Sequence, residues 1–148
     1  MKWLTAGFLI VWLTGCASAF SEPEPKTVGA MVGIVNHTDR YIYSASVNGA
    51  GGANMTAYGA GGASVCCAVI PAVWYPGMKV RVYWDMPVGR THVGKEKEVE
   101  VERYEVPADI YLHFFSDDQV RVVVTVHPGY SPKHPIPAPV KPAGWKKD

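Results

Sequence analysis

Apolar and polar residues alternate in a way that predicts strands along most of the chain. Two apolar runs, residues 65–70 and 78–84, are joined by PAVWYPG, whose prolines cannot lie inside a sheet. Residues 110–115 and 120–126 alternate on either side of a polar turn at residues 116–119. These last two strands are predicted to form an antiparallel hairpin.

Three further strands are expected at residues 28–36, 41–47 and 98–104, the last with valines on one face and glutamates on the other. The stretch 48–64, in which GAGGA occurs twice, is expected to be a mobile or bulged connection, or else a partner-binding loop. No segment after the N-terminal run has a convincing helical period. The pattern therefore predicts an all-β fold of about seven strands, an antiparallel β-sandwich or an open barrel.

The N-terminus is typical of a bacterial lipoprotein signal. Lys2 precedes an apolar run at residues 3–13 that is too short to span a membrane, and Leu-Thr-Gly then leads to Cys16. Cys16 would become the acylated first residue, and two or more acyl chains hold a protein stably on a bilayer. An ordinary cleaved signal is the alternative. Because Ala17 is not aspartate, we expect an outer-membrane anchor facing the periplasm, with the inner membrane as the second choice.

These features divide the chain into four parts. Residues 1–15 are the signal peptide, 16–27 the lipidated cysteine and a flexible tether, 28–127 the β-sandwich domain, and 128–148 a Pro-rich extended tail. Without the signal peptide, the 14 lysines and arginines fall by one and equal the 13 aspartates and glutamates. A near-neutral chain lacks the basic footprint that nucleic-acid binding requires.

Catalytic, cofactor and metal sites are not expected from the sequence. Ser64 lacks the second glycine of a nucleophile elbow and precedes no helix. The chain has five histidines, which show neither metal-ligand nor His-carboxylate spacing: His37, His92, His113, His127 and His134. His113 is expected on the less buried face of its strand. The sequence therefore favours a binding or structural protein over an enzyme.

Cys66 and Cys67 are adjacent, which is unusual. Neighbouring Cα atoms are about 3.8 Å apart, below the usual disulfide range of roughly 4.4 Å upward, and strand alternation points the two sulfurs to opposite faces. Two reduced cysteines that pack as small core residues are the preferred interpretation. A strained disulfide between them and a catalytic thiol are the alternatives.

Several segments together resemble a bacterial lipoprotein family known as domain of unknown function 3304. They are GGASVCC, Ile70-Pro71, Trp74, PGMKV, Trp84, Asn36-His37-Thr38, YLHFF at residues 111–115 and the following Val-rich strand, and Pro-Gly-Tyr at 128–130. The resemblance implies a small all-β lipoprotein encoded near type VI secretion components and lipase effectors, with some members acting as immunity proteins. It implies no catalytic residues.

The expected function is therefore that of a membrane-anchored immunity lipoprotein that binds and neutralises a lipase-type effector of type VI secretion. A structural lipoprotein of the envelope or of the secretion apparatus is the alternative. Loop-borne aromatic residues and arginines are the side chains expected to bind such a partner: Tyr58, Tyr75, Arg90 and Tyr130. Trp74 and Trp84 are expected to have structural roles.

Overall fold

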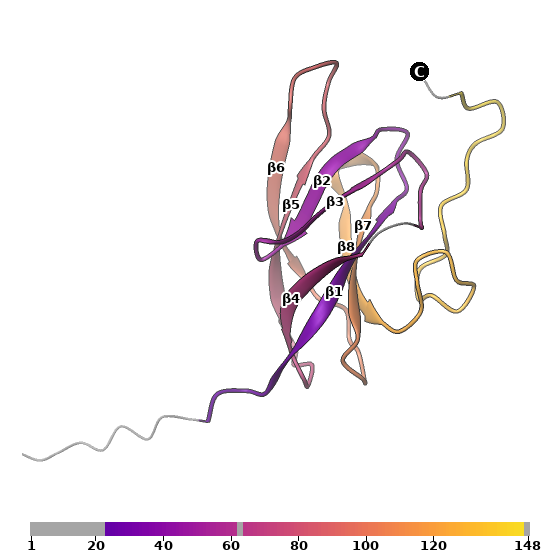
Figure 1. The fold of residues 1–148 in the computed structure, drawn as a ribbon. Coiled ribbons are helices and arrows are strands. Elements are labelled where there is room, and N and C mark those ends of the chain that lie inside the picture. Colours follow the sequence, from indigo (N-terminus) through magenta and orange to yellow (C-terminus); the bar gives the residue numbers. More distant parts are fainter. Residues whose placement is uncertain (1–22, 62–63, 147–148) are drawn as a thin grey trace, which may run out of the picture.

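Two four-stranded sheets face each other in the computed structural model, which describes residues 23–61 and 64–146 (Figure 1). The signal peptide and Cys16 lie outside the described residues. The elements in chain order are β1 (Thr27–Asn36), β2 (Ile42–Val47), β3 (Ala50–Met55), β4 (Val65–Pro71), β5 (Lys79–Asp85), β6 (Gly94–Glu100), β7 (Asp109–Phe114), the short 3₁₀ turn η1 (Ser116–Asp118) and β8 (Val120–Thr125). The all-β sandwich prediction is confirmed.

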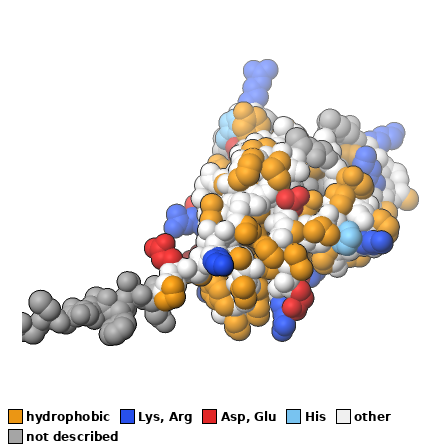
Figure 2. Space-filling view, turned by 60° about the horizontal axis from the view of Figure 1, so that its bottom comes forward, with side chains coloured by type: hydrophobic (Ala, Val, Ile, Leu, Met, Phe, Trp, Pro, Cys, Tyr) orange, Lys and Arg blue, Asp and Glu red, His pale blue; other side chains and the backbone are white. Residues whose placement is uncertain are grey.

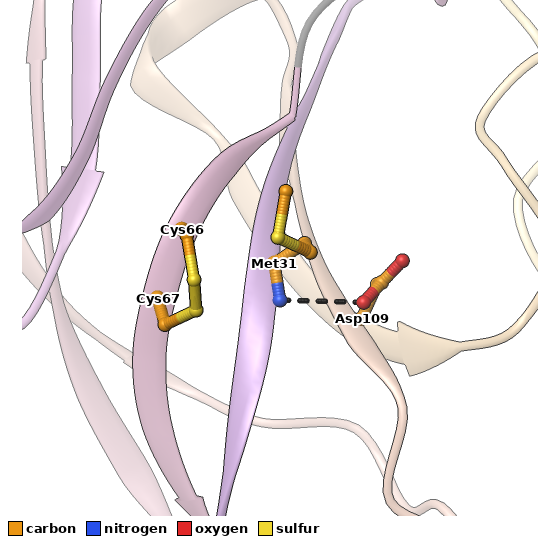
Figure 3. Close-up of a disulfide and its surroundings, with 4 residues drawn as sticks. All are labelled: Met31, Cys66, Cys67 and Asp109. Atoms are coloured by element: carbon orange, nitrogen blue, oxygen red, sulfur yellow. Dashed lines mark hydrogen bonds between the residues drawn. A yellow bond between two sulfur atoms is a disulfide. The ribbon is translucent and has the colours of Figure 1, made fainter.

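One sheet has the strand order β4-β1-β7-β8, and the other has the order β3-β2-β5-β6. We call them sheet A and sheet B. Neighbouring strands are antiparallel except for β1 and β7, which run parallel in the middle of sheet A. β1 has a bulge between Ala30 and Val32, and the Met31 N–H there donates to Asp109 Oδ1 at 3.2 Å (Figure 3).

The space between the sheets is filled by apolar side chains. Trp84 of sheet B lies beside Phe114 of sheet A, with 5.6 Å between the ring centroids. Full burial of one such side chain stabilises a fold by roughly 1.5–3 kcal/mol, so this core is the main source of stability. The largest of the fully buried apolar side chains between the sheets belong to Val32, Ile42, Val47, Ile70, Val82, Val101, Ile110, Leu112, Phe114 and Val122.

Two strand predictions were wrong. The glycine-rich stretch contains β3, an edge strand whose Ala53 and Met55 are buried against the core. Gly51 is needed there because its φ is +118° and a Cβ would lie 2.9 Å from the Ala45 carbonyl oxygen. β6 covers Gly94–Glu100 rather than residues 98–104, because backbone pairing with β5 sets its register while most of its side chains are exposed.

The C-terminal tail is not a free extended chain. Residues 126–146, which we call the C-terminal segment, fold back beside sheet A and then run towards the opposite end of the sandwich (Figure 1). Its Ile136 joins a second apolar cluster with Val35, Tyr111 and Val123 on the outer face of sheet A. Gly129 is also buried, and a Cβ at that position would lie 2.4 Å from Val35 Cγ2. The segment therefore begins where the backbone of Gly129 packs closely against the Val35 side chain.

The expectation of reduced, buried cysteines was also wrong. Cys66 and Cys67 are both exposed on the edge strand β4 and are joined to each other by a disulfide (Figure 3). Only the second half of β4 shows a regular inward alternation, with Ala68 and Ile70 buried. The cysteines precede that stretch, so the alternation rule does not place either of them in the core.

Candidate functional site

Four connections gather at one end of the sandwich, which we call the loop end. Their described residues at this end are 37–41, 56–61, 86–93 and 115–119. Hydrogen bonds tie the first three of them together. The Asn36 N–H donates to Gly59 O at 2.8 Å, and Arg40 Nη2 donates to Met86 O at 2.7 Å. At the other end, Ala72 N–H donates to Lys26 O at 2.7 Å, where the chain arrives from its N-terminal part. We call this the tether end.

The buried side chain of Asn36 organises the loop end. Its amide nitrogen donates to Arg40 O at 2.7 Å and to Thr56 O at 3.0 Å. Its amide oxygen accepts hydrogen bonds from Thr38 N at 3.0 Å and from Thr38 Oγ1 at 2.8 Å. Asn36 is fully buried, so all these bonds form away from water. One residue at the end of β1 thereby fixes the shapes of two loops.

A hollow of about 670 Å³ opens at the loop end. Its wall includes Asp39, Tyr41, Pro87 and Gly89 of two loops, and Lys141 and Trp145 of the C-terminal segment. The Trp145 ring meets Tyr58 edge-on at 5.4 Å, and Lys141 Nζ lies 5.4 Å from the Trp145 ring centroid. Exposed aromatic rings beside lysines are suited to binding an acidic or aromatic protein segment.

Three histidines form a hydrogen-bonded chain beneath the outer face of sheet A. His37 Nε2 lies 3.0 Å from His113 Nδ1, and His113 Nε2 lies 2.8 Å from His134 Nε2. His134 Nδ1 lies 2.7 Å from the His127 carbonyl oxygen. We call these three rings the histidine chain. It links the loop after β1, the middle of β7 and the C-terminal segment.

His113 is the centre of the histidine chain. It lies on the outer face of sheet A, opposite the core-facing Leu112 and Phe114, as predicted, but it is fully buried there. Burial, the neighbouring rings of His134 and His37, and the Arg121 guanidinium lower the pKa of His113 to about 3. Burial and Arg121 also lower the pKa of His37, whose ring stacks on Phe115 at 4.2 Å. The outer face holds His113 because His37 and His134 supply its hydrogen-bond partners.

A histidine and a carboxylate meet elsewhere, although the sequence showed no such spacing. His92 Nδ1 lies 2.6 Å from Asp85 Oδ2, and Val93 N–H donates to Asp85 Oδ1 at 3.0 Å. The His92 ring also packs edge-on against Tyr43 at 4.6 Å. The buried carboxylate thus fixes the loop between β5 and β6. This pair orients the loop and an exposed tyrosine beside the loop end.

A family model for proteins of unknown function, named DUF3304, matches residues 35–122. The chain belongs to the DUF3304 family. No curated protein and no solved structure matches it. The DUF3304 match begins in the last residues of β1 and ends within β8, so it includes Asn36, His37 and His113. The C-terminal segment, which carries His134, Lys141 and Trp145, lies outside the matched range.

The DUF3304 fold does not bring the four predicted partner-binding residues together. Tyr58 and Arg90 lie at the loop end, and Tyr58 contacts Trp145. Tyr75 is half exposed in the connection between β4 and β5, at the tether end. Tyr130 lies exposed beside Gly61, on the flank covered by the C-terminal segment. Only Tyr58 and Arg90 therefore belong to one surface.

Sequence reasoning missed Tyr41, Lys141 and Trp145 at the hollow. The late Gly-Trp-Lys-Lys sequence was a usable signal, because an aromatic residue beside lysines has little reason to end a purely solvated tail. Within residues 23–61 and 64–146, no group of histidines, cysteines and acidic residues is arranged to hold a metal ion. In the same part of the chain, no helix has the length and apolar character needed to cross a membrane.

Proposed function

We propose that this DUF3304 protein is an immunity lipoprotein, anchored to the outer membrane through Cys16 and facing the periplasm. It neutralises a lipase-type effector of type VI secretion by binding it. The observation that carries the proposal is the position of the hollow at the loop end. The chain enters the sandwich at the tether end, so the hollow faces away from a membrane anchor placed before residue 23.

The tether end supports this orientation. A tether of residues 16–26 spans at most about 35 Å, so the domain stays close to the bilayer. Loops at this end expose Val73, Tyr75 and Val106, which are 78%, 50% and 65% exposed. Figure 2 brings this end forward and shows hydrophobic side chains scattered among charged ones. Such a mixed surface suits the neighbourhood of lipid headgroups.

The loop end supports binding by its composition and its rigidity. Protein interfaces are enriched in tyrosine, tryptophan and arginine, and a few of these side chains account for most of the binding energy. Tyr41, Tyr58, Arg90 and Trp145 provide this chemistry, and the Asn36 hydrogen bonds hold two of the loops in place before any partner arrives. A preformed surface loses little conformational entropy on binding.

The test is a pull-down and affinity measurement with the lipase-like or other toxin encoded beside the gene. Tyr41→Ala and Trp145→Ala should weaken binding by tenfold or more, the usual effect of removing an important aromatic contact. Tyr75→Ala is the matched control, because Tyr75 is as exposed as Tyr41 but lies at the tether end. The wild-type domain should also protect cells in which the toxin is directed to the periplasm.

Two results would change the proposal. If the wild-type protein neither binds the toxin nor protects these cells, immunity is wrong and the structural envelope lipoprotein takes its place. If Tyr75→Ala weakens binding as much as Tyr41→Ala, immunity stands but the loop end is not the binding surface.

A further inference from the structure

The histidine chain is the polar contact that holds the C-terminal segment on sheet A. His134 is 5% exposed and bonds to His113 of β7, while its ring meets Tyr111 edge-on at 4.9 Å. Ile136, two residues further on, supplies the apolar contact. The same segment then carries Lys141 and Trp145 into the wall of the hollow. The protonation state of the three rings therefore affects both the docking of the segment and the shape of the loop end.

The hydrogen bonds determine which nitrogen of each neutral ring carries the proton. The His127 carbonyl can only accept, so His134 Nδ1 carries a proton and His134 Nε2 accepts. His113 Nε2 must then donate to His134, which leaves His113 Nδ1 to accept from His37 Nε2. Every contact in the chain is satisfied when all three rings are neutral. Only His37 Nδ1 is left with a free lone pair in this arrangement.

While the C-terminal segment is docked, the histidine chain can take up at most one proton beyond the three that its neutral rings carry. A single extra proton can enter at His37 Nδ1, or shift along the chain, without two N–H groups meeting. A second extra proton would place N–H against N–H in one of the two ring-to-ring contacts, and it would put two positive charges within the three-ring chain. The released segment has no such limit, because all three rings can then be solvated and charged.

The surroundings also oppose positive charge on the chain. From β8, the Arg121 guanidinium faces it, although both oxygens of Glu102 bind that guanidinium at 2.6 and 3.0 Å. From β7, Tyr111 contributes a ring, and from the end of β8, His127 contributes only its carbonyl. No carboxylate of the described residues bonds to the three rings.

The pKa of His113 and of His37 is lowered in the folded protein. Their contribution to docking is therefore complete above the ordinary histidine value of about 6.5 and is lost as the pH falls below it.

We propose that the histidine chain is a single-proton site that docks the C-terminal segment at neutral pH and releases it on acidification. Release uncovers Tyr111 and Val35 on sheet A and removes Trp145 and Lys141 from the loop end. The hollow is then complete at neutral pH and dismantled in acid. This pH-dependent docking goes beyond the proposed function. Its test needs no toxin, so the docking proposal and the immunity proposal can be refuted independently.

The test measures how often the segment opens. Ile136→Cys in the full chain places a thiol at a site that is 3% exposed, and a thiol reagent labels it only when the segment lifts. The labelling rate, divided by that of an unfolded peptide at the same pH, gives the opening constant. Each proton that the docked chain excludes raises this constant about 30-fold between pH 7.5 and 5.0. Because the docked histidine chain takes up at most one of the three protons, at least two are excluded, and the parent should show a rise well above 30-fold, on the order of 900-fold.

Removing titratable rings should reduce the response. In the Ile136→Cys background, His113→Gln with His134→Gln should bring the rise below about threefold. His92→Gln changes a histidine outside the chain and should respond like the parent. Circular dichroism at pH 7.5 checks that the double variant is folded; if it is not, His134→Gln alone must respond at least about tenfold less than the parent. A parent response below about 30-fold, the value for a single excluded proton, or an undiminished response in the folded histidine variants, overturns the proposal.

Discussion

Replacement of Asn36 by alanine tests the idea that one buried amide organises the loop end. The substitution removes all four hydrogen bonds of the side chain. Thr56 O keeps a bond from Gly59 N–H at 3.1 Å, and Arg40 O keeps one from Thr38 Oγ1 at 3.3 Å. The Thr38 N–H keeps no partner among the described residues. The substitution therefore leaves one backbone donor without a partner and makes two loops less rigid.

The magnitude follows from these contacts. Each of the four hydrogen bonds contributes about 1 kcal/mol. The cost of losing them is reduced because the two carbonyl groups keep other partners, and it is increased because one N–H is left unpaired. Together these terms lower the free energy of unfolding by about 3 kcal/mol. With a urea dependence of about 1.5–2 kcal/mol per molar, the unfolding midpoint should fall by roughly 1.5–2 M. This is a large part of the about 5–15 kcal/mol that stabilises a typical domain.

Urea unfolding followed by tryptophan fluorescence is the assay. Asn54→Ala is the matched control, because Asn54 lies exposed on β3 and its loss should change the free energy of unfolding by no more than about 0.5 kcal/mol. A midpoint shift below about 0.5 M for Asn36→Ala, or one equal to that of the control, would refute the assignment of this role to Asn36.

Two further predictions concern the cysteines. Cys16→Ser should leave the domain folded but abolish membrane attachment, which detergent partitioning of both proteins checks; a variant that still partitions with the detergent phase would place the anchor elsewhere. Cys66 and Cys67 should take up no alkylating reagent without a reductant, and intact mass should show the chain lighter by two hydrogen atoms, because both residues are exposed and bonded to each other. Two adducts on the folded, unreduced protein would contradict the disulfide.

Much of the fold could be predicted because strand alternation is a local signal. An apolar residue recurs at every second position of β7 and of β8, and both strands formed as expected. β3 was missed because glycine, alanine and asparagine carry almost no strand propensity. Only pairing with β2 and burial of Ala53 and Met55 make it a strand.

The candidate site was mostly beyond sequence reasoning. His37 and His113 are 76 residues apart, and His113 and His134 are 21 apart, so no spacing along the chain could show that they meet. The hollow likewise needs Tyr41 and Trp145, which come together only because the C-terminal segment returns to the loop end. The Pro-rich composition of that segment predicted an extended tail. It gave no sign of the buried anchors Gly129, His134 and Ile136.

The parallel pairing of β1 with β7 has a consequence for folding during synthesis. β1 is the first strand to emerge, yet Val32–Asn36 pairs with Ile110–Phe114, which follows more than seventy residues later. Until β7 is made, one edge of this apolar strand has unpaired backbone N–H and C=O groups, which favours aggregation. Contacts this distant in sequence also slow folding. We therefore expect truncation before β7 to leave an unfolded chain, and a chaperone that binds unfolded chains to improve the yield of the complete protein.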